Sequence, residues 1–181
     1  KIFPMFEFEL KGGMEDLIQL ERELLEYLGF KTPQGNTDYP RGKYVDVAKE
    51  YGVEELENEH EEQLEKDYGS VFFLENFPER TSPFWNMKLQ EDKVHSNKID
   101  VIIHGIETIG SAERSTSKEE MKEKFETISE GGYADILYAQ FGKERVQDEL
   151  EAFLKNDFFE RSGGGIGVTR MIRAMKLSNL L

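Results

Sequence analysis

Hydrophobic and polar residues alternate at the start of the chain, and the pattern then changes to a helical period. Residues 2–10 read IFPMFEFEL, in which two glutamates fall between large apolar residues, as is typical of a half-buried strand. In residues 14–28 the apolar positions recur every three or four residues, and Gly29 follows them as a helix stop. The pattern therefore predicts a strand and an amphipathic helix before the Pro- and Gly-rich loop of residues 31–42.

Residues 44–67 combine a helical pattern with many carboxylates. A cation site is one interpretation of this segment, but the signal is purely compositional. A solvated helix that carries its charges on the outer face is the simpler interpretation. His60 lies inside the segment and is interpreted as a surface residue.

The rest of the chain alternates short apolar segments with further helical patterns. Short strands are predicted at residues 69–77, 81–89, 99–104 and 106–111. Helices are predicted at residues 117–128, where Ser117 and Glu120 have the spacing of a capping box, and at residues 142–156. This order predicts a single α+β domain over residues 1–181, with an antiparallel sheet flanked by helices.

The chain is acidic and contains no cysteine. Its 181 residues carry a net charge of −14, which argues against a broad basic face for nucleic acid but permits a local basic pocket for a small anion. The lack of cysteine excludes disulfides, thiolate zinc sites and a cysteine nucleophile in this chain. No apolar stretch approaches the roughly 20 residues that span a bilayer, so we expect a cytoplasmic protein without a membrane partner. Because the sequence begins at Lys1 and enters a strand almost at once, we expect that further residues precede it.

Three alternating glycines precede the last helical segment. If Gly163, Gly165 and Gly167 lie in a strand, all three face one side and leave it flat enough for a planar ring. Arg170 lies near the start of the following helix, where it could stack on a base or contact phosphate. A dinucleotide-binding fingerprint needs an acidic residue about 20 positions later, and the chain ends too soon after Arg170 to supply it. A flexible glycine turn before a core helix remains the alternative.

A second group of polar residues accompanies two neighbouring strand segments. Asp100 and Glu107 are expected at the ends of these strands, and Arg114 follows shortly after them. Two carboxylates at strand ends could bind Mg²⁺, which prefers oxygen ligands and often bridges nucleotide phosphates. An arginine nearby could grip a carboxylate with two hydrogen bonds. The alternative is a surface salt bridge between neighbouring strands.

Together the two groups resemble one protein family. The spacing Gly163-x-Gly165-x-Gly167-x-x-Arg170 resembles the third signature motif of class II aminoacyl-tRNA synthetases. DVIIHGIETIGSAER resembles the strand pair that precedes this motif in the aspartyl/asparaginyl subgroup, and the resemblance extends in order through VFFLENFPERTSPFWNM and FEFELKGGMEDLIQLERELL. The long helix before the glycines, and the ending GGGIGVTR, look more like the ammonia-dependent asparagine synthetases, which are aspartate–ammonia ligases derived from synthetases.

The resemblance implies a fold, a reaction and partners. The fold is an antiparallel sheet flanked by helices, usually in a homodimer. The reaction is a ligation in which aspartate attacks the α-phosphate of ATP to give aspartyl-AMP, and ammonia then displaces AMP. The implied partners are aspartate, ATP, Mg²⁺ and ammonia.

The resemblance also implies roles for individual residues. Arg170 contacts ATP, and Gly163, Gly165 and Gly167 make room for the adenine. Asp100 and Glu107 bind Mg²⁺, and Glu107 also falls on an ATP-binding position. Arg114 binds a carboxylate of aspartate, with Glu7 and Ser111 as further substrate-binding residues, and the catalytic residues are Arg114 and Arg170.

This sequence departs from the family pattern at several positions. The dimer-forming motif 1 and the first half of motif 2, with its ATP-binding arginine, are absent from it. Met5 stands where the family commonly has a glutamine for the substrate amino group, Gly110 where some aspartyl enzymes have a metal-contacting serine, and Thr169 where synthetases usually have glutamate. Two alternatives therefore stay open, namely the catalytic domain of an asparaginyl- or aspartyl-tRNA synthetase that uses tRNA, and a non-catalytic synthetase paralogue.

Overall fold

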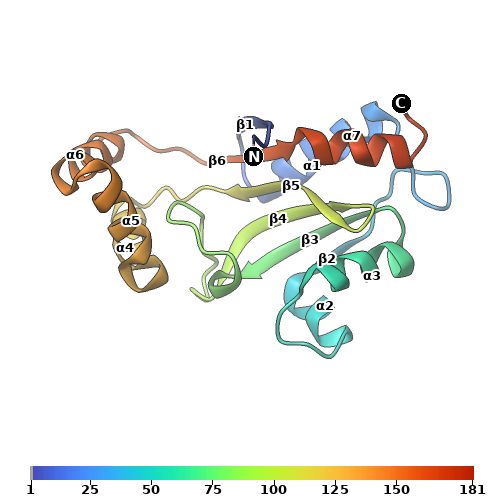
Figure 1. Cartoon of the computed structure of the whole chain (residues 1–181), viewed down its shortest axis with the longest axis horizontal. Helices are drawn as coiled ribbons and strands as arrows, with labels where there is room; N and C mark the ends of the chain where they lie inside the picture. Colours follow the sequence, from blue (N-terminus) through green and yellow to red (C-terminus); the bar gives the residue numbers. More distant parts are fainter. Residues whose placement is uncertain (1) are drawn as a thin grey trace.

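The core of the molecule is a mixed six-stranded sheet with helices on both sides (Figure 1). The computed structural model describes residues 2–181, and Lys1 lies outside the described residues. In spatial order the strands are β1 (Met5–Lys11), β6 (Arg161–Gly167), β5 (Ile106–Glu113), β4 (His95–Ile103), β3 (Val71–Pro78) and β2 (Arg41–Lys43). Every neighbouring pair is antiparallel except the short β2, which runs parallel to β3. The predicted α+β class is confirmed, with this one parallel pair as the difference from the predicted antiparallel sheet.

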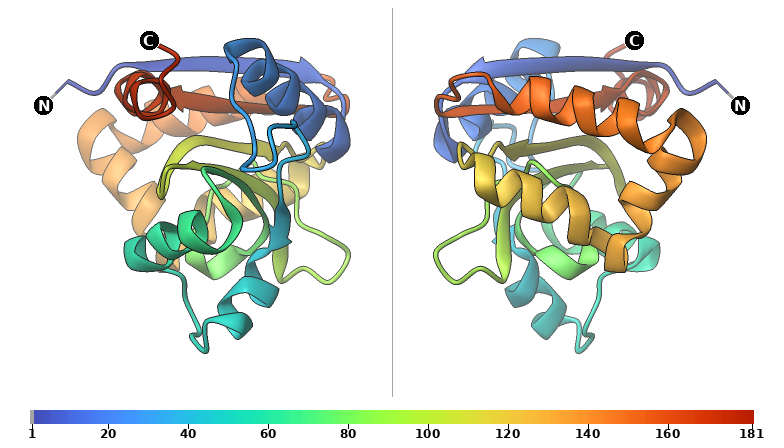
Figure 2. Two further views of the ribbon diagram at one scale, coloured as in Figure 1. Left: turned by 90° about the vertical axis from the view of Figure 1, so that its right-hand side faces the viewer. Right: turned by 90° about the vertical axis from the view of Figure 1, so that its left-hand side faces the viewer.

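The helices divide into three groups, which Figure 2 shows from both ends. Helices α1 (Met14–Leu28) and α7 (Val168–Leu177) cover one face of the sheet. Helices α2 (Tyr44–Glu50) and α3 (Asn58–Tyr68) cover only the β3 side of the other face. Helices α4 (Lys118–Thr127), α5 (Gly132–Phe141) and α6 (Lys143–Leu154) form a separate group between β5 and β6, at one end of the molecule. None of the helices within residues 2–181 is both long and apolar enough to cross a membrane.

Strand alternation distributes the side chains of β4 between the two faces. Ile99, Val101 and Ile103 are fully buried and pack with residues of α1 and α7 in the main core. Ile102, on the opposite face, belongs to a second core beneath α2 and α3. Because α2 and α3 cover only the β3 side and the beginning of β5 on that face, the rest of the sheet stays open there, and this opening positions the candidate site.

The predicted helix ends are largely correct. Gly29 ends α1 with a φ of 96°, a left-handed conformation that glycine adopts without strain. Ser117 Oγ accepts a hydrogen bond from the Glu120 N–H at the start of α4, as the capping box predicts. The reciprocal bond of the box is not formed, because the Ser117 N–H donates to Ser115 Oγ instead.

Several predicted elements differ from the structure. The acidic segment is not one helix, because it is interrupted between α2 and α3, where Gly52 has a φ of 68°. Residues 81–89 form a loop with isolated bridges to the sheet and not a strand. Helix α5 was not predicted. Strand β4 begins at His95, so Asp100 lies in the middle of a strand and not at its end.

Candidate active site

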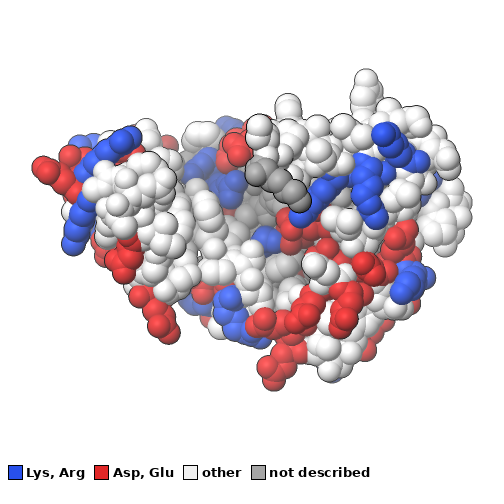
Figure 3. All heavy atoms as spheres, in the orientation of Figure 1, with Lys and Arg blue, Asp and Glu red and all other residues white. Residues whose placement is uncertain are grey.

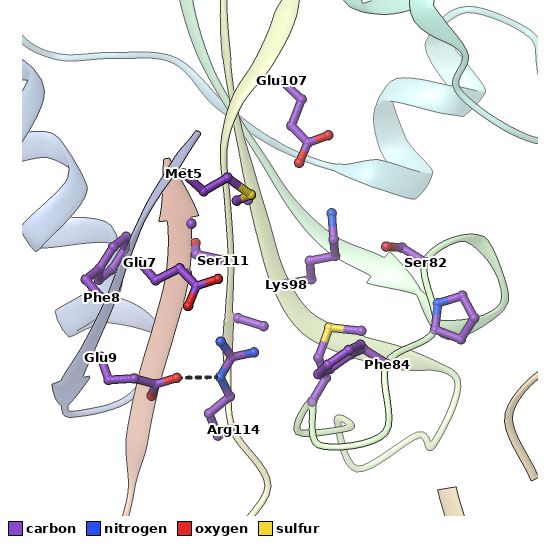
Figure 4. Close-up of a pocket in the computed structure, with 16 residues that line it drawn as sticks. Met5, Glu7, Phe8, Glu9, Ser82, Phe84, Lys98, Glu107, Ser111 and Arg114 are labelled. Atoms are coloured by element: carbon purple, nitrogen blue, oxygen red, sulfur yellow. Dashed lines mark hydrogen bonds and ion pairs between the residues drawn. The ribbon is translucent and has the colours of Figure 1, made fainter. Parts of the chain in front are cut away.

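A cavity of about 600 Å³ lies on the open face of the sheet (Figure 4). Its floor comes from β1, β6, β5 and β4, and its far wall comes from the loop that contains Ser82, Pro83 and Phe84. Successive side chains of a strand point to opposite faces of the sheet, and this alternation decides which side chains reach the cavity. The register pairs Lys98 with Ala112 and Asp100 with Gly110, so these residues share the cavity side of β4 and β5.

The three alternating glycines lie in β6, on the cavity side. Gly165 pairs with Gly110 on one side and with Glu7 on the other, so the centre of the floor is built almost entirely of backbone. The predicted strand and its single glycine face are confirmed. The face is not bare, however, because Glu9 and Met5 lie over Gly163 and Gly165, where any added Cβ would collide with them.

Arg170 ties the start of α7 to β5. Its Nη1 donates a hydrogen bond to the Glu107 carbonyl at 2.6 Å and lies 3.7 Å from Glu107 Oε2. Its guanidinium also lies 5.5 Å from the ring centroid of Phe3, which in turn lies over Gly167. Phe3 and Arg170 thus form a pair of planar groups at one end of the glycine strand.

Asp100 and Glu107 are brought together, although Asp100 is not at a strand end. Asp100 is buried and forms a salt bridge with Lys98, while its Oδ1 has no hydrogen-bond partner. Burial raises the pKa of Asp100 above its ordinary value, and the Lys98 ammonium opposes this shift. Glu61, from α3, joins them by accepting a hydrogen bond from the Glu107 N–H at 3.0 Å, and burial raises the pKa of Glu61 as well.

Asp100 and Glu107 are the two residues that could hold a divalent cation between them. Both carboxylates face Gly110, where an added Cβ would lie 2.6 Å from Glu107 Oε1 and 3.5 Å from Asp100 Oδ1, so glycine keeps the space between them free. Mg²⁺ typically binds one or two carboxylates together with phosphate oxygens and water. Within residues 2–181 no group of three or more acidic or histidine side chains could bind a metal ion, so the pair needs ligands from a bound nucleotide or solvent.

Arg114 stands at the other end of the floor, directly after β5. Its side chain is 17% exposed, and its Nε lies 3.3 Å from Glu9 Oε1. Arg161 lies near it on β6, and burial lowers the pKa of Arg161. Figure 4 shows the carboxylate of Glu7 pointing into the space beside Arg114. The cavity therefore has a cationic end suited to a carboxylate, with two acids beside it.

Ser111 borders the cavity, but its hydroxyl is engaged elsewhere. Ser111 Oγ donates a 2.6 Å hydrogen bond to Glu21 of α1, on the packed side of the sheet. Glu21 is almost fully buried, and this burial raises its pKa to about 8. The structure thus brings Glu7, Glu107, Arg114 and Gly165 to one cavity and places Asp100 in an adjoining hollow, but it directs the Ser111 hydroxyl away from the cavity.

Several residues of the site were not predicted from the sequence. Lys98 could have been found, because it lies two positions before Asp100 and so shares its strand face. Phe3 and Phe84 carry no pattern that separates them from core aromatics. Glu61 lies in the acidic segment, where nothing in the composition distinguishes it from its solvated neighbours. Figure 3 shows how these neighbours dominate the surface over α2 and α3, beneath the basic residues of α7.

The chain matches the family described as tRNA synthetases class II (D, K and N) over residues 3–179. It therefore belongs to this family, as the resemblance of its glycine and carboxylate motifs indicated. Among curated proteins it is 32% identical over 108 residues to the aspartate–tRNA(Asp) ligase of Pyrobaculum aerophilum, covering 55% of this chain and 25% of that protein. It is 28% identical over 167 residues to the aspartate–tRNA(Asp/Asn) ligase of Methanopyrus kandleri, covering 85% of this chain and 34% of that protein.

Solved structures show the same fold. The aspartyl-tRNA synthetase of Entamoeba histolytica superposes with a TM-score of 0.73 at 16% identity, covering 95% of this chain and 40% of that one. The asparaginyl-tRNA synthetase of Pyrococcus horikoshii superposes with a TM-score of 0.71 at 18% identity, covering 95% and 45%. This chain spans less than half the length of each of the curated relatives and solved structures named here. Their names fit the tRNA-synthetase alternative better than the ammonia ligase.

Proposed function

We propose that this chain is the catalytic domain of a ligase that activates aspartate with ATP and transfers the aspartyl group to tRNA. Membership of the class II family supports the ligase chemistry. The observation that carries the proposal is the glycine strand on the floor of the cavity, with the Phe3–Arg170 pair beyond one end, at Gly167, and the largely buried Arg114 at the other. The proposal includes a homodimer in the cytoplasm and treats residues 1–181 as one domain.

ATP takes the end of the cavity near Arg170. The adenine lies between the Phe3 ring and the Arg170 guanidinium, because both are planar and the bare backbone of Gly167 lets planar groups approach the strand closely. The half-exposed side chains of Phe3 and Met5 move to admit it. Asp100 and Glu107 would hold Mg²⁺, which would screen the negative charge that repels an attacking carboxylate.

Aspartate takes the other end. Arg114 binds its side-chain carboxylate through a charged, two-pronged hydrogen bond, and the exposed Glu9 side chain turns away to permit this. Glu7 binds the α-ammonium, a role that Met5 cannot perform. The α-carboxylate oxygen then forms a bond to the α-phosphorus as the bond to pyrophosphate breaks, which gives aspartyl-adenylate. The residues act chiefly by holding the two anions in position.

The acceptor of the aspartyl group has two candidates, tRNA and ammonia. The relatives named above are tRNA ligases, and this supports tRNA. Ammonia is favoured by Thr169, which replaces the glutamate usual in synthetases, and by the net charge of −14, which opposes a polyanion.

Aspartate-dependent exchange of pyrophosphate into ATP tests the first step, with asparagine and lysine as competing substrates. Exchange with aspartate that Arg114→Ala abolishes, and that Arg145→Ala on the surface of α6 leaves intact, supports the proposal. AMP release is then measured with tRNA or with ammonium. Release of AMP in the presence of tRNA supports the main proposal, and release in the presence of ammonium supports the second candidate. If neither exchange nor release is observed, the chain is a non-catalytic paralogue.

A further inference from the structure

Lys98 is the one side chain at the centre of the cavity to which neither the motifs nor the proposed reaction assigns a task. It extends from β4 on the cavity side and forms a salt bridge with Asp100. Its Nζ lies 3.9 Å from the ring centroid of Phe77, and the side chain is only 12% exposed. The ammonium is therefore fixed in place from two sides.

The Lys98 side chain lies at the junction of two hollows. Lys98 and Glu107 line the main cavity and also an adjoining hollow of about 250 Å³, which Asp100 borders as well. Figure 4 shows the Lys98 amine pointing across this junction toward the Glu107 carboxylate. An ammonium has three N–H donors, and Asp100 accepts one of them, so donors are left for a ligand in the cavity.

The charges around Lys98 explain why a cation is needed there. Asp100, Glu107 and Glu61 gather at one point of the open face, and two cationic side chains, Lys98 and Arg170, act on them. Lys98 covers Asp100 Oδ2, while Asp100 Oδ1 stays without a partner and faces Gly110. One side of this carboxylate is thus closed by a protein cation, and the other is free for a metal ion.

We propose that Lys98 is a built-in cation that occupies one cation position of the carboxylate cluster and contacts the phosphate of the bound nucleotide. The phosphate contact rests on the proposed function, whereas the occupation of the cation position does not. The ammonium supplies at this position the positive charge that a second divalent ion would otherwise bring. The site then needs divalent metal only between Asp100 Oδ1 and Glu107.

The first test replaces the charge and measures nucleotide binding without metal. The variant is Lys98→Met, and the matched control is Lys88→Met, which breaks the 2.6 Å pair of Lys88 with the buried Glu113 outside the cavity lining. The probe is a non-hydrolysable aspartyl-adenylate analogue, titrated by calorimetry in EDTA. We expect Lys98→Met to weaken binding about tenfold or more and Lys88→Met to leave it unchanged. Equal affinities in the two variants would overturn the phosphate contact.

The second test needs no nucleotide. Manganese binding is measured by electron paramagnetic resonance on the parent and on both variants. We expect Lys98→Met to bind Mn²⁺ more tightly than the parent, because the removal of the ammonium frees Asp100 Oδ2, and Lys88→Met to match the parent. Unchanged binding in Lys98→Met would show that Lys98 does not fill a cation position.

Two further variants separate an effect of Lys98 on ligand binding from a folding defect caused by Lys98→Met. Lys98→Arg keeps the charge and should retain analogue binding in EDTA. The double variant Lys98→Met/Asp100→Asn removes both buried charges and should still bind the analogue about tenfold more weakly than the parent. If the parent binds neither ATP nor the analogue, the proposed function and the phosphate contact both fail, and the manganese titration alone decides the cation position.

Discussion

The two faces of the central sheet each bury a carboxylate, but they treat it differently. On the packed face, Glu21 accepts a hydrogen bond from Ser111 and forms no ion pair with any residue in the range 2–181. On the cavity face, Asp100 lies against the Lys98 ammonium. Burial raises the pKa of both acids, and only Asp100 has a fixed cation that lowers it again. The packed face thus holds its acid without a counter-charge, whereas the cavity face pairs its acid with a fixed cation.

Phe73→Ala tests the packed face where its contribution to stability is largest. The ring is fully buried in the main core and stacks on Tyr39 at a centroid distance of 6.1 Å. Its loss should lower the free energy of unfolding by about 3–5 kcal/mol, because a large cavity is left behind. Urea unfolding measures this. Arg114→Ala, on the cavity face, serves as the control and should change the free energy of unfolding by less than about 1 kcal/mol. Equal losses in the two variants would show that the two faces do not differ in their contribution to stability.

Glu21→Gln tests whether the packed face holds a neutral acid. In the folded parent the carboxyl keeps its proton up to a pKa of about 8, whereas the unfolded chain loses it near 4.5. Unfolding therefore releases a proton between these values, and the parent should lose stability as the pH rises through this window. The variant keeps the Ser111 hydrogen bond and should be more stable than the parent by a few kcal/mol at pH 9, since one pKa unit corresponds to about 1.4 kcal/mol.

Thermal unfolding of both proteins between pH 4 and 9 checks this expectation. Near pH 4 the two should be about equally stable, because the acid is then largely protonated in both states of the parent. Parallel pH profiles for parent and variant would mean that Glu21 is ionised in the folded protein.

Arg170→Ala tests the cavity face. The guanidinium bonds to the Glu107 carbonyl and lies beside the Phe3 ring, so its loss should weaken ATP binding roughly 10- to 100-fold, equivalent to about 1.4–2.7 kcal/mol. The free energy of unfolding should fall by no more than about 1 kcal/mol. Calorimetric titration with ATP gives the affinity. If ATP binds Arg170→Ala as it binds the parent, the adenine does not lie at this end of the glycine strand.

Ser117→Ala gives a reference outside both faces. Its hydroxyl caps α4 in the separate helical group, and removal should cost about 1 kcal/mol. Hydrogen exchange should accelerate in the first turn of α4 and stay unchanged in β4 and β5. Faster exchange in the sheet would show that the helical group and the two faces are energetically one unit.

The amino-acid pattern predicted those parts of the fold that depend on local periodicity. The strand at Met5–Lys11, the helix that ends at Gly29 and the cap at Ser117 all follow from spacing and end signals within a few residues. The break between α2 and α3 and the missed α5 did not follow. Polar composition is continuous across that break, and the apolar residues of α5 are spread around the helix and form no single stripe that would mark it in the sequence.

Within the candidate site, the sequence predicted only which residues of one strand share a face. Gly163, Gly165 and Gly167 share a face because they are two residues apart, and the structure confirms this. The side that Ser111 faces depends on the register of β5 with β4 and on the bulge near Val101, which parity within one segment does not reveal. Glu61 reaches Glu107 across 46 residues of chain, so its role depends on tertiary packing alone.

The place of β6 in the sequence also determines when the glycine floor can form during synthesis of the chain. In the part of the chain that the structure describes, β1 has β6 as its sole sheet neighbour, and β6 is the last strand in the sequence. During synthesis, β1 therefore emerges long before residues 161–167, the strand that pairs with it in the described sheet. Joining the two strands closes a very long loop, which is a slow kind of step in folding. The strand that carries the glycine floor is thus also the last strand of the described sheet to be synthesised, so a chain arrested before Arg161 would lack the floor of the cavity.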